Sequence, residues 1–220
     1  MVELKNEMLT IQVAEKGAEL QSVKDNDGKE YMWQAGPQWN RHSPILFPIV
    51  CSVNNDRYTV DGKDYHLPRH GFARDMMFTV VSLTSEKVTM ALHDSEETLK
   101  VYPYRFNLAV TYRLEGNKVH VIWHVENTDT KEIHFQIGGH PAFNMPSGKL
   151  EGMIKLDNEE PMDMLKSYAD GSVDSKGWWR ARPQVQDSHL ALYAQHIHCS
   201  TAGCCGQFSF PCDTQPDRCS

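Results

Sequence analysis

Apolar and polar residues alternate along three successive stretches in the middle of the chain. The first covers residues 106–114, the second follows the turn Glu115–Asn117 and covers 119–125, and the third covers 133–137. A period of two over neighbouring runs is typical of antiparallel strands. The pattern therefore predicts three consecutive strands whose polar face is either half wet or lines a cleft. The apolar residues of the first two stretches are Phe106, Leu108, Val110, Tyr112, Leu114, Val119, Val121, Trp123 and Val125.

Shorter alternating runs precede this region and also predict strands. They lie at 10–14 and 18–23, on either side of Asp61-Gly62 within 57–67, and on either side of Ser85-Glu86 within 77–94. Asp-Gly between two such runs favours a hairpin. Residues 95–103 allow at most one helical turn, which Asp94 or Ser95 would open and Pro103 would close. The chain is therefore predicted to be all-β.

Composition narrows the class of protein. With 220 residues and 40% apolar content, the chain is expected to be globular. Its net charge of −7 disfavours a nucleic-acid partner. The first residues lack the apolar core of a secretory signal, and no run approaches the roughly 18 apolar residues of a membrane span. We therefore expect no membrane partner and a cytoplasmic location. The first 198 residues contain a single cysteine, Cys51, which fits a reducing compartment.

The pattern changes at about Ser175. No sustained period follows, and five cysteines gather near the end of the chain. Two cysteines separated by two residues do not occur there, so the spacing of common zinc modules is not met and no metal site is predicted. We expect residues 1–174 to form one incomplete domain. Residues 175–220 would be an atypical cysteine-rich tail outside the native fold, without a pairing partner upstream.

Two stretches carry residues that ordinary strand ends rarely need. Arg41 precedes a proline-punctuated apolar run, where a cleft arginine would donate to hydroxyl oxygens. Gly71 allows a turn that would aim His70 inward with Phe72 beside it, and a histidine of near-neutral pKa can donate or shuttle a proton. A surface arginine and a satisfied loop histidine remain the alternatives.

The third stretch is "FQIGGHPAFN", residues 135–144. Pro141 favours an extended conformation for His140, and the two preceding glycines remove side chains where another group comes close to the backbone. His140 is therefore predicted to be a positioned acid, with Phe143 as an apolar wall for a sugar. A tight turn at a strand end is the alternative.

Together the stretches "NRHSPILFPIV", "YHLPRHGFAR", "YPYRFNLAVTYRL" and "FQIGGHPAFN" resemble the aldose 1-epimerase (galactose mutarotase-like) family, and its bacterial LacX-like branch in particular. The resemblance covers about residues 1–174. It implies a large antiparallel β-sandwich and cofactor-free interconversion of the α and β anomers of an aldohexose. By resemblance, His140 is the acid at the ring oxygen, His70 donates near that oxygen, and Arg41 holds sugar hydroxyls.

The family's catalytic base is a glutamate on a later strand, and the resemblance stops near Asp174. We hypothesise that a frameshift replaced the following third of the chain, which would impair activity and leave apolar sheet surface exposed. Two further functions are considered: a hexose-6-phosphate 1-epimerase, with Arg41, Arg69 and Arg74 as phosphate ligands, and a non-catalytic carbohydrate-binding protein. The preferred aldose and the oligomeric state do not follow from the sequence.

Overall fold

A computed structural model of the chain describes residues 1–144, 166–167, 173–174 and 204–211. Strands in antiparallel pairs make up most of the regular structure, which confirms the all-β prediction. Within the described residues the α-helical part is a single element of six residues, α1 (Glu96–Val101). None of the described helices has the length and apolar character needed to cross a membrane.

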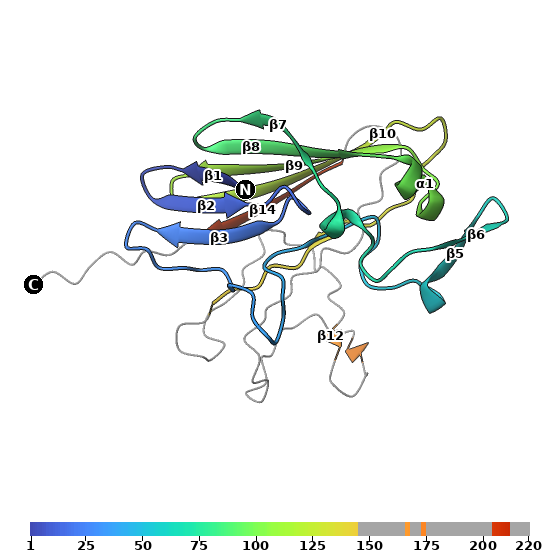
Figure 1. Ribbon diagram of the computed structural model, residues 1–220, viewed down its shortest axis with the longest axis horizontal. Helices are drawn as coiled ribbons and strands as arrows, with labels where there is room; N and C mark the ends of the chain where they lie inside the picture. Colours follow the sequence, from blue (N-terminus) through green and yellow to red (C-terminus); the bar gives the residue numbers. More distant parts are fainter. Residues whose placement is uncertain (145–165, 168–172, 175–203, 212–220) are drawn as a thin grey trace, which may run out of the picture.

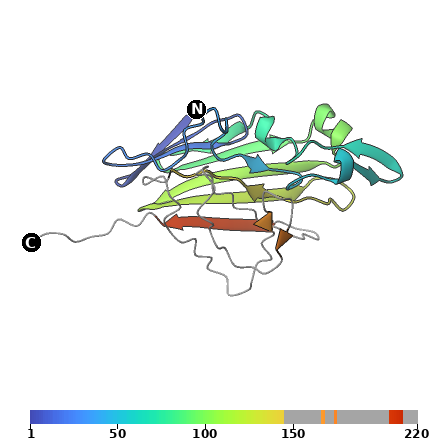
Figure 2. The same ribbon diagram turned by 90° about the horizontal axis from the view of Figure 1, so that it is seen from below.

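Two sheets form the body of the molecule and lie one over the other (Figures 1 and 2). The smaller contains β1 (Val2–Lys5), β2 (Leu9–Val13) and β3 (Leu20–Asp25) in chain order. The larger contains, in spatial order, β14 (Cys204–Pro211), β10 (Lys118–Asn127), β9 (Phe106–Glu115), β8 (Lys87–His93) and β7 (Thr79–Leu83). The remaining strands form three short pairs: β4 (Ile45–Leu46) with β11 (Gly138–Gly139), β5 (Arg57–Val60) with β6 (Lys63–His66), and β12 (Lys166–Ser167) with β13 (Val173–Asp174). Two 3-10 helices, η1 (Asn54–Asp56) and η2 (Ala73–Asp75), lie in the connections.

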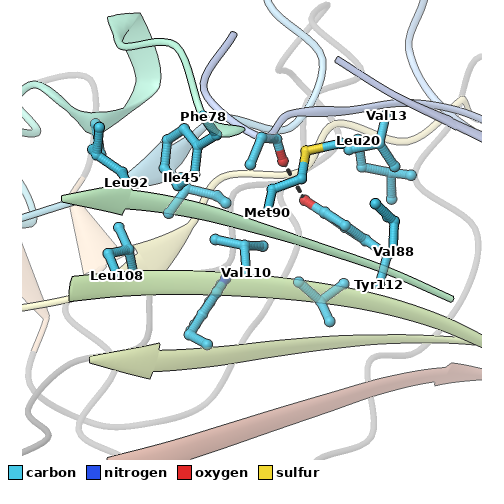
Figure 3. Packing of buried hydrophobic residues seen from close by; sticks show 14 of the residues in the cluster. Val13, Leu20, Ile45, Phe78, Val88, Met90, Leu92, Leu108, Val110 and Tyr112 are labelled. Atoms are coloured by element: carbon cyan, nitrogen blue, oxygen red, sulfur yellow. Dashed lines mark hydrogen bonds between the residues drawn. The ribbon is translucent and has the colours of Figure 1, made fainter. Parts of the chain in front are cut away.

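The apolar faces of the two sheets meet in one core (Figure 3). Val13 and Leu20 come from the smaller sheet, Val88 and Met90 from the larger, and Ile45 from β4. Each of these side chains is at most 4% exposed. Burial of apolar surface at about 25 cal/mol per Å² is what holds two such sheets together, so the alternating pattern of the sequence is explained by one shared core.

The predicted strand pair at the centre of the chain is confirmed. β9 alternates buried and half-buried residues along most of its length, and it pairs with β10 in a register that sets Val110 opposite Trp123. The hairpin at Asp61-Gly62 is confirmed by β5 and β6. A helix that begins after Ser95 is confirmed by α1, where the Ser95 hydroxyl accepts a hydrogen bond from the Thr98 amide, but its six residues exceed the single turn predicted.

The third predicted strand, residues 133–137, is wrong. Ile133 and Ile137 are buried, as the period predicted, but the segment forms no strand ladder. Its polar groups bond to irregular backbone instead: the Gln136 amide donates to the Pro48 carbonyl at 2.8 Å, and the Gln136 side chain accepts from the Val50 amide at 3.0 Å. The partner segment, residues 48–50, contains Pro48, and a proline has no backbone N–H to donate to a strand ladder.

The second edge of β10 is occupied by β14, which comes from the cysteine-rich tail. The pairing is antiparallel and runs from Lys118 opposite Pro211 to Val125 opposite Cys204. The sequence predicted no partner upstream for this part of the tail, and that expectation is wrong for 204–211. The division of the chain at residue 174 stays a prediction.

Candidate functional site

His70 is held in place by its neighbour across the loop, Cys51. The His70 amide donates to the Cys51 carbonyl at 2.7 Å, and the Cys51 amide donates to His70 Nδ1 at 3.0 Å. Because Nδ1 accepts, a neutral His70 ring carries its hydrogen on Nε2. His70 and Gly71 both have a positive φ, 68° and 69°. A Cβ at Gly71 would meet the Phe47 carbonyl oxygen at 2.2 Å, so the glycine is what lets the two backbones pass.

The surroundings of His70 disfavour its protonation. Burial lowers its pKa first, and the positive charges of Arg74 and Arg69, then His140 and Arg41, lower it further, to about 4. The ring is therefore neutral at pH 7. With Nδ1 engaged by a backbone amide, His70 can offer an N–H from Nε2 to an oxygen atom.

His140 follows β11 and is fixed by the segment that carries Arg41. Gly138 and Gly139 pair with Leu46 and Ile45 of β4. The His140 amide then donates to the Pro44 carbonyl at 3.0 Å. The close approach predicted at the glycines is made by the indole of Trp123, which a Cβ at Gly139 would meet at 3.3 Å. Gly139 thus leaves room for the Trp123 indole directly before the histidine.

The fold brings the two predicted histidines together. The ring centroids of His70 and His140 lie 6.2 Å apart, with the ring planes inclined by 70°. The Trp39 ring also lies next to His140, at 5.1 Å between centroids. Sequence reasoning missed Trp39, although an aromatic residue two positions before Arg41, a predicted sugar ligand, is a recognisable signal.

Two interactions link Arg41 to the site: its charge lowers the pKa of His70, and its guanidinium forms an ion pair with Asp75. Its guanidinium donates to the Asp75 carboxylate at 2.8 Å, and Arg74 Nε lies 3.7 Å from the second oxygen of Asp75. Arg74 also donates to the Arg69 carbonyl at 2.6 Å. Asp75 was not predicted, because Arg41 lies 34 residues before it in the sequence. The charges of three arginines thus act on His70, in a chain of net charge −7.

Phe72 and Phe143 lie at the border of the core. The Phe72 ring packs against Phe47, Tyr102 and Phe106 at centroid distances of 6.1–6.3 Å. Phe143 is half-buried and its backbone bridges to Met32. Both lie close in sequence to the histidines, and their contact with a sugar stays a prediction.

The side chains of His70, His140 and Arg41 can bind the hydroxyl and ring oxygens of a sugar by hydrogen bonds. A neutral imidazole that carries its hydrogen on Nε2, a second imidazole and a guanidinium can together donate hydrogen bonds and exchange a proton. In the part of the chain that the structure describes, no three histidine, cysteine or carboxylate side chains gather as a metal site.

The family model of aldose 1-epimerase matches residues 1–171 of the chain. The chromosomal LacX protein of Lactococcus lactis subsp. lactis is 42% identical over 152 residues, which are 66% of this chain and 51% of that protein. Galactose mutarotase of Rattus norvegicus is 24% identical over 225 residues, covering 89% of this chain and 64% of that protein. The chain thus spans about half to two thirds of the length of these curated relatives.

Solved structures show the same fold. A galactose mutarotase related enzyme from Lactobacillus acidophilus is 38% identical with a TM-score of 0.67, covering 87% of this chain and 64% of that one. A galactose mutarotase-like protein from Lactobacillus casei is 34% identical with a TM-score of 0.67, covering 88% and 67%. The family model, the identity to LacX and the shared fold agree, and the chain belongs to the aldose 1-epimerase family.

Proposed function

We propose that the protein is an aldose 1-epimerase that interconverts the α and β anomers of a hexose. The observation that carries the proposal is the pair His70 and His140, whose ring centroids lie 6.2 Å apart although 70 residues separate them in sequence. Membership of the family supports the same reaction class.

In the proposed mechanism, His140 protonates the ring oxygen as the C1–O bond breaks. His70 donates a hydrogen bond from Nε2 to the same region of the sugar. It stays neutral at pH 7, because its pKa is lowered to about 4. Arg41 holds sugar hydroxyls. The ring opens to the aldehyde, the C1–C2 bond rotates, and closure on the other face gives the second anomer. The reaction needs no cofactor.

Ring opening also requires a base for the anomeric hydroxyl proton. The carboxylate tied to the described cluster is Asp75, and it is engaged by Arg41. We therefore propose that the 220-residue chain is impaired, because loss of a general base costs on the order of 10²–10⁴-fold in rate.

Anomer exchange of glucose, followed by NMR, tests the proposal. We expect the chain to accelerate exchange above the buffer rate and His140→Asn to abolish that acceleration. His93→Asn changes an exposed histidine of β8 and serves as the matched control. A His140 variant that exchanges anomers as fast as the unmodified chain would contradict the assignment, as would a chain that leaves the buffer rate unchanged.

A phosphorylated sugar is the second candidate substrate, and the arginine cluster favours it. Arg41, Arg69 and Arg74 all act on His70 through their charge, and Arg41 forms an ion pair with Asp75. A phosphate is the kind of anion that such a cluster binds. Faster exchange of glucose 6-phosphate than of glucose, lost at high salt and in Arg69→Gln, would support this substrate; equal rates would exclude it.

A carbohydrate-binding protein without catalysis is the third candidate. Trp39, at 5.1 Å from His140, offers the aromatic face that such a protein needs. A His140→Ala variant that keeps sugar affinity and loses turnover supports the enzyme. Sugar binding without turnover in the unmodified chain supports the binding protein.

A further inference from the structure

A single carboxylate oxygen holds the loop next to Arg41. Glu19 lies at the end of the β2–β3 turn and is half-buried. Its Oε1 accepts from the His42 amide at 2.9 Å and from the Ser43 amide at 3.0 Å. Hydrogen bonds to an ionised acceptor are stronger than those to a neutral one. Glu19 therefore fixes the backbone directly after Arg41, although it lies more than 20 residues before it.

The same short segment holds His140. The His42 carbonyl accepts from the Ala142 amide at 2.9 Å, and the Pro44 carbonyl accepts from the His140 amide at 3.0 Å. Residues 42–44 thus lie between the Glu19 carboxylate on one side and the histidine segment on the other. A shift of this segment would displace Arg41 and His140 together.

Glu19 is itself held firmly. The Tyr112 hydroxyl, buried in the core, donates to the Ala18 carbonyl at 2.7 Å, the dashed line from Tyr112 in Figure 3. Ala18 adopts a positive φ of 45°. The Gly17 amide donates to the Met76 carbonyl at 2.7 Å, and a Cβ at Gly17 would meet the Arg74 carbonyl oxygen at 2.7 Å. The turn is therefore clamped to the core and to the segment that follows His70.

We propose that Glu19 is a positioning residue that sets the places of Arg41 and His140 relative to His70. The β2–β3 turn contacts the two parts of the site separately: Glu19 holds residues 42–43, and Gly17 holds the chain beyond Arg74. Glu19 acts through the backbone in this assignment, since its Oε1 accepts from the His42 and Ser43 amides. The inference rests on the proposed function of Arg41 and His140.

Three variants of the full chain separate this role from a general effect on stability. Glu19→Ala removes the acceptor, Glu19→Gln keeps an amide oxygen without the charge, and Glu15→Ala removes a carboxylate of the same turn that bonds to the chain's N-terminus instead. Amide hydrogen exchange at His42, Ser43 and His140 is measured for each, with the core strand residue Val110 as the reference for global unfolding.

We expect E19A to speed exchange at His42, Ser43 and His140 by about 10–100-fold relative to Val110, as loss of hydrogen bonds to a charged group implies. E19Q is expected to restore most of the protection and E15A to leave it unchanged. In the anomer assay, E19A should raise KM through Arg41 and lower kcat through His140, and E19Q should recover both.

Two outcomes would overturn the proposal: unchanged exchange at these amides in E19A, or an equal rise in E15A. If E19A does not fold, Glu19→Asp decides, because the shorter side chain withdraws the carboxylate from the His42 and Ser43 amides. Unchanged protection with unaltered kcat and KM in that variant would overturn the proposal. If the unmodified chain has no turnover, the proposed function fails, whereas the exchange data still decide whether Glu19 places His140.

Discussion

The environment of His70 predicts a specific dependence of stability on pH. The variant that tests it is His70→Asn, since asparagine tolerates the left-handed backbone of this position, where φ is 68°. Its side-chain oxygen also offers an acceptor to the Cys51 amide in place of Nδ1. The variant therefore keeps the local geometry and removes the titrating group.

The sign follows from the two states of the chain. Burial, the arginines at 41, 69 and 74, and His140 lower the pKa of folded His70 from 6.5 to about 4. Between these values the unfolded chain binds the proton and the folded chain does not, so acid favours unfolding. The stabilisation is fully present above pH 6.5 and is lost as the pH falls towards 4.

Linkage between these two pKa values gives an upper bound of about 2 kcal/mol for the loss between pH 7 and pH 5. His70 is only 7% exposed, but the arginines that contribute to the shift are partly exposed, and solvent screens their charges. We therefore expect a loss of about 1 kcal/mol that His70→Asn does not show.

Urea unfolding at pH 7, 6 and 5, followed by tryptophan fluorescence, measures both proteins. At each pH, the unfolding free energy of His70→Asn is subtracted from that of the unmodified chain. The contributions of all other titrating groups cancel in this difference, because both proteins contain them. We expect this difference to shrink by about 1 kcal/mol from pH 7 to pH 5. A difference that stays constant within about 0.3 kcal/mol would refute the assignment of a depressed pKa to His70.

The remaining predictions concern the fold. Gly71→Ala is expected to destabilise the protein far more than Gly62→Ala in urea unfolding, because both have a positive φ but only the first meets a carbonyl oxygen, at 2.2 Å. Ser95→Ala should cost about 1 kcal/mol by loss of the helix cap, also read by urea unfolding. Met90→Ala, fully buried, should cost about 2–5 kcal/mol, and a smaller loss would place it outside the core. Val81→Lys, on the exposed edge strand β7 where the valine is 64% exposed, should raise the soluble fraction on expression.

Much of the fold was predictable because its signals are local. The alternation at 106–114 and 119–125 indicates which side chains are buried, and β9 and β10 follow it. Asp61-Gly62 places a hairpin, and Ser95 begins a helix, since each depends on the conformations of a few adjacent residues. β1 was not predicted, because its four residues are too short a run for the period to stand out.

The candidate site was predictable only in part. The sequence indicated His70, His140 and Arg41 as residues in unusual local settings. It contained no sign that Cys51 would engage Nδ1 of His70 or that Asp75 would bind Arg41, because these partners lie 19 and 34 residues away.

The sequence by itself determined which faces are buried, where turns and the helix begin, and which residue types are available for chemistry. Only the tertiary structure decided the pairing partners, as residues 133–137 and β14 demonstrate. The physical reason is that side-chain burial follows the local period, whereas a backbone amide bonds to whichever acceptor the packed chain brings within reach. The same rule applies to Glu19, whose carboxylate accepts from two amides that lie 23 and 24 residues away in the sequence.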